Sequence, residues 1–420
     1  MSAVAAQPLL DVLKESIAFK AGGEPVGNLT MGRGTFDGRP LHVAIVEGRI
    51  ASGSLGTPEC QCLSALFDVV ARERSSLVMY LDSAGARVSE GLKALGAFRS
   101  LYRSGLDAAF SGAPIAVVLG RNCFGGASMI AHLAPQRLFG PNTQMAMSGP
   151  SIIASASGVS VLDEVFRAMA DASLSPAARV KVSPANDLWI EGDRLSTWLT
   201  EALAQRGDAA AALRARHEAL ELRLDKRVAD RPWEPVRRRD LEKIYDAGYD
   251  ARESDGFLLG KGTRGGLEES LAGIVGRNAL GASRAWRFAD AIWKMGEQPP
   301  ERLQVLLDCA SHAARLDDER IVLTEYIVDM GFALSALARR GTQVGLTVLG
   351  KAGGGVYVAL AAPAQRVTSV YGSSDIQVLP GAAVAAILGQ STESTPSFQE
   401  YLAAGVADEE LKLGFIPGTQ

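Results

Sequence analysis

The stretch from Leu77 to Gly85 reads Leu-Val-Met-Tyr-Leu-Asp-Ser-Ala-Gly, an apolar run that ends in an aspartate and small residues. A second run, 115–119, opens into Gly120-Arg121-Asn122-Cys123-Phe124-Gly125-Gly126-Ala127-Ser128. Apolar runs of about five residues predict buried strands, and glycines directly after them predict turns. Residues 92–110 place apolar side chains at helical spacing between the two runs. The pattern therefore predicts strand–helix–strand crossovers and a parallel sheet.

The second half of the chain repeats this pattern. Residues 305–307 are followed by Asp308-Cys309-Ala310-Ser311, and residues 346–349 by Gly350-Lys351-Ala352-Gly353-Gly354-Gly355-Val356. The offset between matching landmarks is nearly constant, at 226 from residue 82 to 308 and 229 from residue 125 to 354. Repeats of about 20–50 residues are typical of solenoids. This longer spacing predicts two copies of a whole domain, which can face each other and share one site.

We therefore expect an α/β fold with two tandem domains, over residues 1–195 and 256–420, joined by a helical connector over 196–255. A chain of 420 residues is too long for one ordinary core. Within the connector, residues 201–227 are rich in Ala, Leu, Arg and Glu and predict a long solvated helix. The basic cluster Arg237-Arg238-Arg239 that follows is either a solvated helix start or a contact for a phosphate-bearing substrate arm or an acidic partner.

Composition and charge exclude several classes of protein. The chain is 47% hydrophobic and 21% charged, which is typical of soluble globular proteins, and its formal net charge of −4 gives no reason to expect nucleic acid as a partner. Apolar stretches fall far short of the roughly 20 residues of a membrane helix. Residues 1–7 lack the features of a signal peptide. The four cysteines suit neither a disulfide framework nor a zinc site. We expect a cytoplasmic protein without metal, nucleic-acid or membrane partners.

Side chains suited to conventional catalysis are scarce. Of the four histidines, His42, His132 and His217 are predicted to be structural, and His312 remains as a candidate. The sequence has no nucleophile elbow, no paired-histidine zinc motif and no Walker-type phosphate loop. Nucleophilic and metal mechanisms therefore lack their parts.

Glycine and alanine are abundant where strands lead into helices. Such turns leave backbone N–H groups pointing outward, with the positive end of a helix dipole behind them. Two turns on adjacent strands can aim two N–H donors at one oxygen, which is the geometry of an oxyanion hole for a thioester carbonyl. Glycine is needed there because side chains would block the approach to the backbone. The alternative is that small residues only let helices pack closely on the sheet.

The combined motifs resemble a known family. Residues 82–91, Asp-Ser-Ala-Gly-Ala-Arg-Val-Ser-Glu-Gly, together with Phe124-Gly125-Gly126-Ala127-Ser128 and Met147-Ser148-Gly149-Pro150-Ser151-Ile152-Ile153, resemble the β-type carboxyltransferase domain of the crotonase-like superfamily. The nearest likeness is to malonate decarboxylase β subunits. Residues 308–313, 350–356 and Val378-Leu379-Pro380-Gly381-Ala382-Ala383 resemble the partner α- or γ-type subunit. The resemblance covers roughly residues 34–160 and 265–390, and it implies two crotonase-type ββα-superhelix domains.

The sequence departs from the family pattern in three places. Ala84-Gly85 stands where family members commonly carry Gly-Gly, and no four-cysteine zinc ribbon is present. Ser311-His312 stands where the acetyl-CoA carboxylase α subunit has Pro-Gly, and it is closer to the Ser-Gln of the malonate decarboxylase γ subunit. The last departure makes His312 a candidate proton donor.

The resemblance implies a fused β–γ malonyl-thioester decarboxylase, a carboxy-lyase that forms the acetyl thioester through an enolate held by backbone oxyanion holes. We expect the first-copy amides to hold the thioester oxygen, the second-copy turn to orient the carboxylate, and His312 or a water to protonate the carbanion. The expected catalytic residues are Ala84, Gly85, Gly126, Ala127, Ser311, His312, Gly354 and Gly355. The expected substrate-binding residues are Ser83, Arg87, Gly125, Ser148, Gly149, Gly353, Pro380 and Gly381.

No covalently bound cofactor is expected. The resemblance implies that the acyl group arrives on an acyl-pantetheine arm, either of coenzyme A or of an acyl carrier protein. It also implies a homo-oligomer or a place in a multi-subunit complex. Two alternatives remain open, namely a biotin-dependent carboxyltransferase that moves the malonyl carboxyl group to biotin, and a catalytically inactive acyl-binding subunit.

Overall fold

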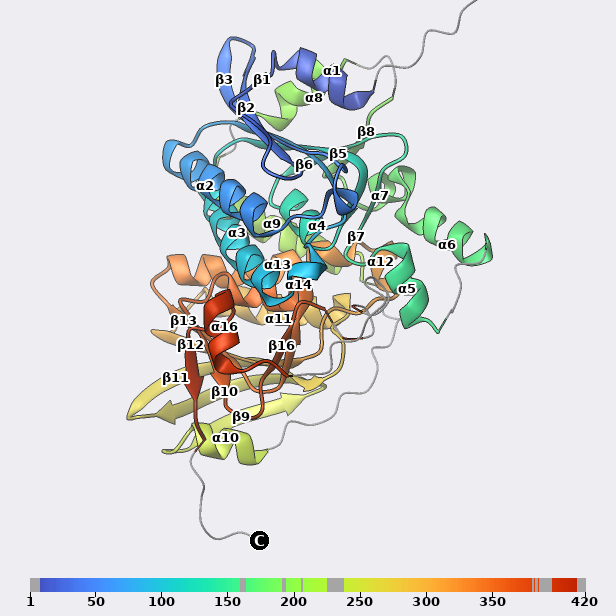
Figure 1. Ribbon diagram of the computed structural model, residues 1–420. Helices are drawn as coiled ribbons and strands as arrows, with labels where there is room; N and C mark the ends of the chain where they lie inside the picture. Colours follow the sequence, from blue (N-terminus) through green and yellow to red (C-terminus); the bar gives the residue numbers. More distant parts are fainter. Residues whose placement is uncertain are drawn as a thin grey trace, which may run out of the picture. The chain divides into compact units, whose positions relative to one another are not determined.

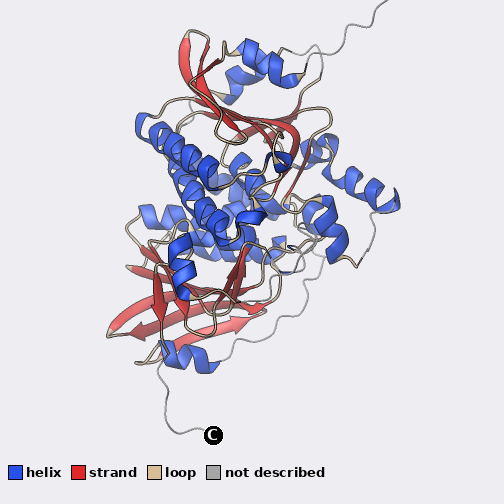
Figure 2. Ribbon diagram, in the orientation of Figure 1, coloured by secondary structure: helices blue, strands red, loops and turns tan. Residues whose placement is uncertain are grey.

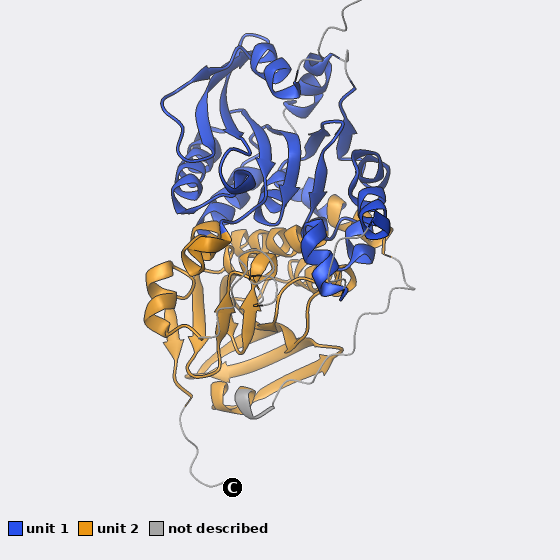
Figure 3. Ribbon diagram, turned by 45° about the vertical axis from the view of Figure 1, so that its right-hand side comes forward, with its two compact units in different colours: residues 1–87, 100–215, 314–325 blue, residues 88–99, 216–313, 326–420 orange. Residues whose placement is uncertain are grey.

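The computed structural model describes residues 8–158, 164–190, 194–204, 207–224, 238–379, 381, 384 and 395–413, with the backbone alone at 238–240. Two of the sequence predictions therefore lie outside the described residues. These are Pro380 and the side chains of the basic cluster at 237–239. The described chain forms two compact units, shown in Figure 3. Unit 1 comprises residues 1–87, 100–215 and 314–325, and unit 2 comprises residues 88–99, 216–313 and 326–420.

Unit 1 is built on a mixed sheet with the strand order β1-β2-β3-β4-β5-β6-β8, and β7 pairs with the end of β5. The first three strands are antiparallel, and every pairing from β3 onward is parallel. The strands are β1 (Lys20–Ala21), β2 (Leu29–Phe36), β3 (Arg39–Val46), β4 (Leu77–Ser83), β5 (Ile115–Phe124), β6 (Gln136–Phe139), β7 (Gln144–Ala146) and β8 (Asn186–Leu188).

Helices connect and cover these strands (Figures 1 and 2). They are α1 (Leu9–Ser16), α2 (Thr57–Glu73), α3 (Leu92–Phe110), α4 (Gly126–Ala131), α5 (Pro150–Ala156), α6 (Glu164–Leu174), α7 (Pro176–Val182), α8 (Leu195–Ala202) and α12 (Leu316–Arg320), with a short 3₁₀ turn at Ala51–Gly53 and another at Val88–Glu90. The turn at Val88–Glu90 and residues 92–99 of α3 lie in unit 2, whereas residues 100–110 of α3 lie in unit 1. Helices α1 and α8 lie side by side and share one core cluster with β3 and β5.

Unit 2 repeats this topology with the order β9-β10-β11-β12-β13-β15-β17, while β14 and β16 form a separate parallel pair. Its strands are β9 (Tyr249–Ser254), β10 (Phe257–Arg264), β11 (Leu267–Arg277), β12 (Arg302–Cys309), β13 (Gln343–Val348), β14 (Lys351–Gly353), β15 (Arg366–Val370), β16 (Asp375–Gln377) and β17 (Glu409–Leu411). Its helices are the second half of α9 (Ala209–Glu221), α10 (Arg238–Ile244), α11 (Ala282–Met295), most of α13 (Leu323–Arg339), α14 (Gly354–Ala361) and α16 (Phe398–Ala404). The predicted α/β fold with two tandem, mainly parallel sheets is confirmed.

The sequence explains the central strands directly. Four of the seven side chains of β4 are completely buried apolar groups, at Leu77, Val78, Met79 and Leu81. Consecutive buried positions mean that both faces of the strand are covered, as helices cover both faces of a parallel sheet. Helix α2 begins at the adjacent loop, where the Glu59 carboxylate accepts a hydrogen bond from the Gly56 amide at 3.1 Å.

The repeat extends to individual hydrogen bonds. The Asp82 carboxylate accepts from the Asn122 amide at 3.0 Å, and the Asp308 carboxylate accepts from the Lys351 amide at 2.8 Å. The Leu55 amide donates to the Gly85 carbonyl at 2.8 Å, and the Leu280 amide donates to the Ser311 carbonyl at the same distance. The two copies therefore hold their strand-end turns with the same backbone contacts.

The connector differs from the prediction of one long solvated helix over residues 201–227. Helix α8 ends at Ala202 and α9 begins at Ala209. The interruption has a local cause, because Asp208 Oδ1 accepts from the amides of Ala210 and Ala211 at 2.9 and 3.3 Å and so caps a new helix. His217 of α9 is also buried rather than solvated. The prediction of a single solvated helix was wrong.

Each unit contains one short segment from the other copy of the repeat. Residues 88–99 of the first copy lie in unit 2, and residues 314–325 of the second copy lie in unit 1 (Figure 3). Both ends of these segments are related by the same offset, from 88 to 314 and from 99 to 325, which is 226 residues. The exchange is therefore reciprocal and follows the repeat.

Candidate active site

The two predicted turns of unit 1 adjoin each other. Ser83, the last residue of β4, pairs in register with Cys123 of β5. Gly85 has a φ of +94°, and a Cβ there would lie 2.6 Å from the Phe124 carbonyl oxygen and 3.2 Å from the Gly126 amide nitrogen. Only glycine fits this position without strain, because L-residues rarely adopt such a φ and the neighbouring backbone occupies the space. The structure therefore brings the Ala84–Gly85 turn against the Gly125–Gly126 turn.

The hydrogen bonds of these turns distinguish the candidate donors. The Ala84 amide donates to the Ser52 carbonyl at 2.9 Å, so the loop itself uses it. The Gly85 amide donates to the Ser83 hydroxyl at 3.1 Å. Gly126 and Ala127 begin α4, and the first amides of a helix have no partner within it. Of the four predicted donors, the amides of Ala84 and Gly85 thus have hydrogen-bond partners within unit 1, whereas those of Gly126 and Ala127 stand at the start of a helix.

Unit 2 brings together the corresponding residues of the second copy. The Ala310 amide donates to the Arg277 carbonyl at 3.3 Å, as Ala84 donates to Ser52. Gly354 has a φ of +55°, and a Cβ there would lie 2.6 Å from Ser311 Oγ and 3.3 Å from His312 Nδ1. Gly353 precedes α14, and Gly355 lies in its first turn. Ser311, His312 and the glycines of this turn therefore form one cluster.

His312 is buried in this cluster, with its Nδ1 3.2 Å from Ser311 Oγ. Burial lowers the pKa of His312 to about 4, because the charged ring loses its hydration. The imidazole is therefore neutral at pH 7. In this form the ring can donate one hydrogen bond and accept another, and its role as a proton donor stays a prediction.

The buried neutral ring gives a prediction for stability against pH. The folded-state pKa lies below the ordinary value of 6.5, so the unfolded chain binds the proton more tightly. The stability contributed by this group is present above pH 6.5 and is lost as the pH falls through about 4, by up to about 3 kcal/mol. Urea unfolding between pH 7 and 4 measures this loss. A His312→Asn variant should show a shallower pH dependence, and an unchanged dependence would contradict the assignment.

Two of the residues predicted to bind substrate, Ser83 and Arg87, have side-chain partners within unit 1. Arg87 forms an ion pair with Glu59 and donates to the Ser54 carbonyl at 2.8 Å, which fastens the turn to the start of α2. Ser83 is buried, and its hydroxyl donates to the Gly53 carbonyl at 2.7 Å. Both side chains thus have structural partners, and their predicted contact with substrate stays a prediction.

The remaining predicted residues are backbone elements. Gly125 has a φ of +54° and precedes α4, and Gly149 is the residue before α5. The Ser148 amide donates to Glu319 Oε1 at 2.9 Å. Gly381 is half-buried. Ser148 and Gly149 lie close to the turn that contains Gly125, since the Gly125 amide donates to the Ala146 carbonyl at 3.1 Å and a Cβ on Gly149 would lie 3.8 Å from the Phe124 ring.

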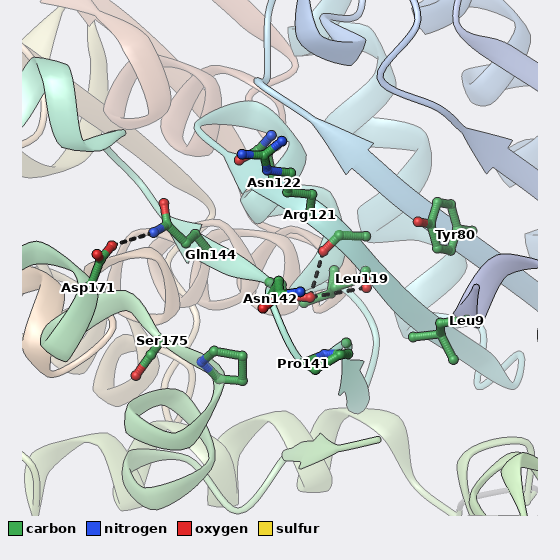
Figure 4. Close-up of a pocket in the computed structure, with 14 residues that line it drawn as sticks. Leu9, Tyr80, Leu119, Arg121, Asn122, Pro141, Asn142, Gln144, Asp171 and Ser175 are labelled. Atoms are coloured by element: carbon green, nitrogen blue, oxygen red, sulfur yellow. Dashed lines mark hydrogen bonds between the residues drawn. The ribbon is translucent and has the colours of Figure 1, made fainter. Parts of the chain in front are cut away.

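Sequence reasoning missed two groups of residues around this site. The first is the exchanged segment 314–325, discussed below. The second lines a cavity of about 710 Å³ in unit 1, along the second half of β5 and the segment 140–144 that follows β6 (Figure 4). Figure 4 shows Gln144 donating to Asp171 Oδ1, at 2.7 Å, on one side of this cavity. Its other polar lining includes Tyr80, Arg121, Asn122 and Asn142. The carboxyl ends of parallel strands are where open α/β sheets bind ligands.

The three other histidines are buried and have polar neighbours, consistent with the structural roles predicted for them. His132 Nδ1 lies 2.6 Å from the Ser128 carbonyl, His217 Nδ1 lies 2.6 Å from Asp329 Oδ2, and His42 Nε2 lies 2.8 Å from an Arg33 nitrogen. Within the described ranges, no three His, Cys, Asp or Glu side chains gather as a metal site would require. In the same part of the chain, no helix has both the length and the apolar character needed to span a bilayer.

A family model of known proteins matches the first copy of the repeat. Residues 13–168 match the family model of the carboxyl transferase domain, and this range includes both glycine turns of unit 1. This part of the chain is therefore similar to carboxyl transferase domains, and the match covers less than half of the 420 residues.

Curated relatives align with the same part of the chain. The methylmalonyl-CoA carboxyltransferase 12S subunit of Propionibacterium freudenreichii subsp. shermanii is 28% identical over 152 residues, which are 36% of this chain and 29% of that protein. A putative propionyl-CoA carboxylase beta chain of Bacillus subtilis is 32% identical over 134 residues, which are 31% of this chain and 26% of that protein. The methylmalonyl-CoA decarboxylase subunit alpha of Veillonella parvula is 28% identical over 165 residues, which are 39% of this chain and 32% of that protein. The chain matches about a third or less of the length of these relatives.

Solved structures align over more of the chain at lower identity. A transcarboxylase 12S crystal structure is 18% identical and covers 97% of this chain and 86% of that chain, with a TM-score of 0.41. A Pseudomonas malonate decarboxylase hetero-tetramer in complex with malonate is 20% identical and covers 55% of this chain and 88% of that chain, with a TM-score of 0.42.

Proposed function

We propose that this chain decarboxylates a malonyl thioester through an enolate held by backbone amides. The observation that carries the proposal is the contact between the two glycine turns of unit 1, where Gly85 lies against the Gly126 amide. This arrangement suits a small anionic oxygen rather than a bulky group. The carboxyl transferase domain match over residues 13–168 supports chemistry at the α-carbon of an acyl thioester.

In the proposed reaction, the bond between the α-carbon and the carboxylate breaks and its electron pair moves into the enolate. CO₂ leaves, and negative charge develops on the thioester oxygen. The amides of Gly126 and Ala127, at the start of α4, would stabilise this charge, and removing one such donor typically costs about 2.7–4 kcal/mol in the barrier. The enolate carbon then takes a proton to give the acetyl thioester.

The second copy would act on the carboxylate. We assign its orientation to the turn that contains Ser311 and Gly354, the counterpart of the first-copy turn. Because His312 is neutral at pH 7, we propose that a water molecule donates the proton to the enolate carbon and that the His312 ring orients this water. The fused β–γ arrangement is part of the proposal.

The acyl group would arrive on the pantetheine arm of coenzyme A or of an acyl carrier protein. Relatives whose names include methylmalonyl-CoA and propionyl-CoA support a thioester substrate. A homo-oligomer or multi-subunit complex is proposed by analogy with relatives described as a hexamer assembly and as a hetero-tetramer. We place the protein in the cytoplasm on the composition of the chain alone.

Carboxyl transfer to biotin is a second candidate, supported by relatives named as carboxyltransferase and as biotin-dependent carboxylase subunits. Carboxyl transfer and decarboxylation form the same enolate. They differ because the carboxyl group passes to biotin in the first reaction and is released as CO₂ in the second.

One experiment separates these reactions. The full chain is incubated with malonyl-CoA and, in parallel, with malonyl-loaded acyl carrier protein, each with and without free biotin and avidin, and products are identified by mass spectrometry. CO₂ release at the same rate with and without avidin supports decarboxylation. Turnover that requires biotin and stops with avidin supports carboxyl transfer. Absence of turnover in every arm would contradict both and leave an inactive acyl-binding subunit.

A further inference from the structure

The segment that the second copy contributes to unit 1 lies next to the helix that presents the candidate amides. Residues 314–325 belong to unit 1 (Figure 3) and contain α12 and the start of α13. Thr324, in the first turn of α13, is completely buried, and its Oγ1 lies 3.1 Å from Ser128 Oγ of α4. These two residues are 196 positions apart in the sequence.

The direction of the hydrogen bonds follows from the single proton of each hydroxyl. Ser128 Oγ donates its proton to the Gly125 carbonyl oxygen at 2.7 Å. Thr324 must then be the donor in its contact with Ser128, because Ser128 has no second proton to give. A chain of two hydrogen bonds therefore runs from Thr324 through Ser128 to the Gly125 carbonyl.

Fixing this carbonyl also fixes an amide. The Gly125 carbonyl and the Gly126 N–H belong to one planar peptide unit and point in opposite directions. Gly125 has a φ of +54° and a ψ of −127°. Because glycine can adopt many backbone conformations, the peptide unit that follows it could also take other orientations. The Gly125 carbonyl accepts from the Met129 amide at 3.2 Å as well as from Ser128, and these two hydrogen bonds together set where the Gly126 N–H points.

The other side of Gly125 is held by the same segment. The Gly125 amide donates to the Ala146 carbonyl at 3.1 Å, at the end of β7. Two residues later, the Ser148 amide donates to Glu319 Oε1 at 2.9 Å, and Glu319 Oε2 pairs with the buried Arg179 at 3.4 Å. Glu319 thus holds the loop that supports the glycine turn, while Thr324 holds the turn itself.

We infer that Thr324 is a positioning residue for the Gly126 amide, supplied to the first-copy site by the second copy of the repeat. The inference rests on the proposed function for its effect on rate. Thr324 does not touch substrate, since its side chain is completely buried, and it acts through Ser128. The first-copy turn is accordingly not complete without the second copy.

Thr324→Val tests the inference, because valine keeps the shape and removes the donor. An amide misplaced from the developing oxyanion loses stabilisation in the transition state only, so kcat for thioester turnover should fall about 10- to 100-fold while KM changes less than about twofold. Thr324→Ser restores a hydroxyl and should recover kcat to within about threefold. The matched control is Thr342→Val, which removes a buried hydroxyl that donates to the Pro300 carbonyl at 2.7 Å in unit 2. It should leave kcat unchanged.

Hydrogen exchange separates failure of the inference from failure of the proposed function. In Thr324→Val, amides of residues 124–132 should exchange faster than in the wild type, and in Thr342→Val they should not. Unchanged exchange, a kcat equal to wild type, or an equal drop in kcat in the control would each overturn the inference. If the wild type turns over no thioester while exchange changes as expected, the proposed function fails and the positioning role stands.

Discussion

Replacing Gly85 with alanine is expected to lower kcat for thioester turnover at least about 100-fold. The new Cβ would lie 2.6 Å from the Phe124 carbonyl and 3.2 Å from the Gly126 amide nitrogen. The turn must open to accept it, which moves an amide away from the developing oxyanion. Loss of one such donor corresponds to about 2.7–4 kcal/mol in the barrier, or 10²–10³ in kcat. Steady-state kinetics on the folded variant measures the effect.

The same substitution also strains the backbone, because Gly85 has a φ of +94°. Gly112→Ala is the matched control. Gly112 has a φ of +77°, and nothing lies within 4 Å of a Cβ at that position. Both variants should lose about 1–3 kcal/mol of unfolding free energy from strain. Only Gly85→Ala should lose activity per folded molecule. Equal kcat values in the two variants would show that the contact between the turns has no catalytic role.

The parts of the fold predicted from the sequence are those that local patterns encode. Residues 77–81 and 115–119 are continuous apolar runs because their strands are covered on both faces, and the glycines after them mark turns that need a positive φ or a close approach. A repeat of such patterns also predicts a repeat of topology, which the two strand orders confirm.

The parts that were missed depend on partners far away in the sequence. Nothing near Ala84 indicates that its amide donates to Ser52, because that contact exists only once the strands pair. Thr324 and Glu319 lie in the second copy, and periodicity says only that they belong to the start of a helix. Reciprocal exchange of segments has no local signature. The break between α8 and α9 did have one, because Gly207-Asp208 is a recognisable helix stop and cap.

Equivalent residues of the two copies can also differ in burial, and the sequence repeat does not indicate this difference. Arg137 and Arg366 are related by the offset of 229. Arg137 is the second residue of β6, and Arg366 is the first residue of β15. Arg137 is completely buried, whereas 67% of the Arg366 side chain is exposed. Arg366 pairs with Glu409, 43% of whose side chain is exposed. Arg137 instead pairs with the buried Glu325 of the exchanged segment at 3.1 Å.

Arg137→Met is therefore expected to lower the free energy of unfolding by about 3–5 kcal/mol. Arg137 also donates to Asn186 Oδ1 at 2.7 Å and to the Ala134 carbonyl at 3.0 Å, so its removal leaves several buried acceptors without their donor. Glu325 would remain as a buried charge, with the Ser183 hydroxyl at 2.9 Å as a neutral donor. Urea unfolding of the full chain measures the loss.

Arg366→Met removes the same side chain from the equivalent position of the other copy. An exposed ion pair contributes about 0–1 kcal/mol, so this control should change the unfolding free energy little. In the double variant Arg137→Met and Glu325→Leu, both charges are gone, and the loss should be smaller than for Arg137→Met alone. A double variant as unstable as the single one would mean that the hydrogen bonds of Arg137, rather than its neutralisation of Glu325, hold segment 314–325 in unit 1.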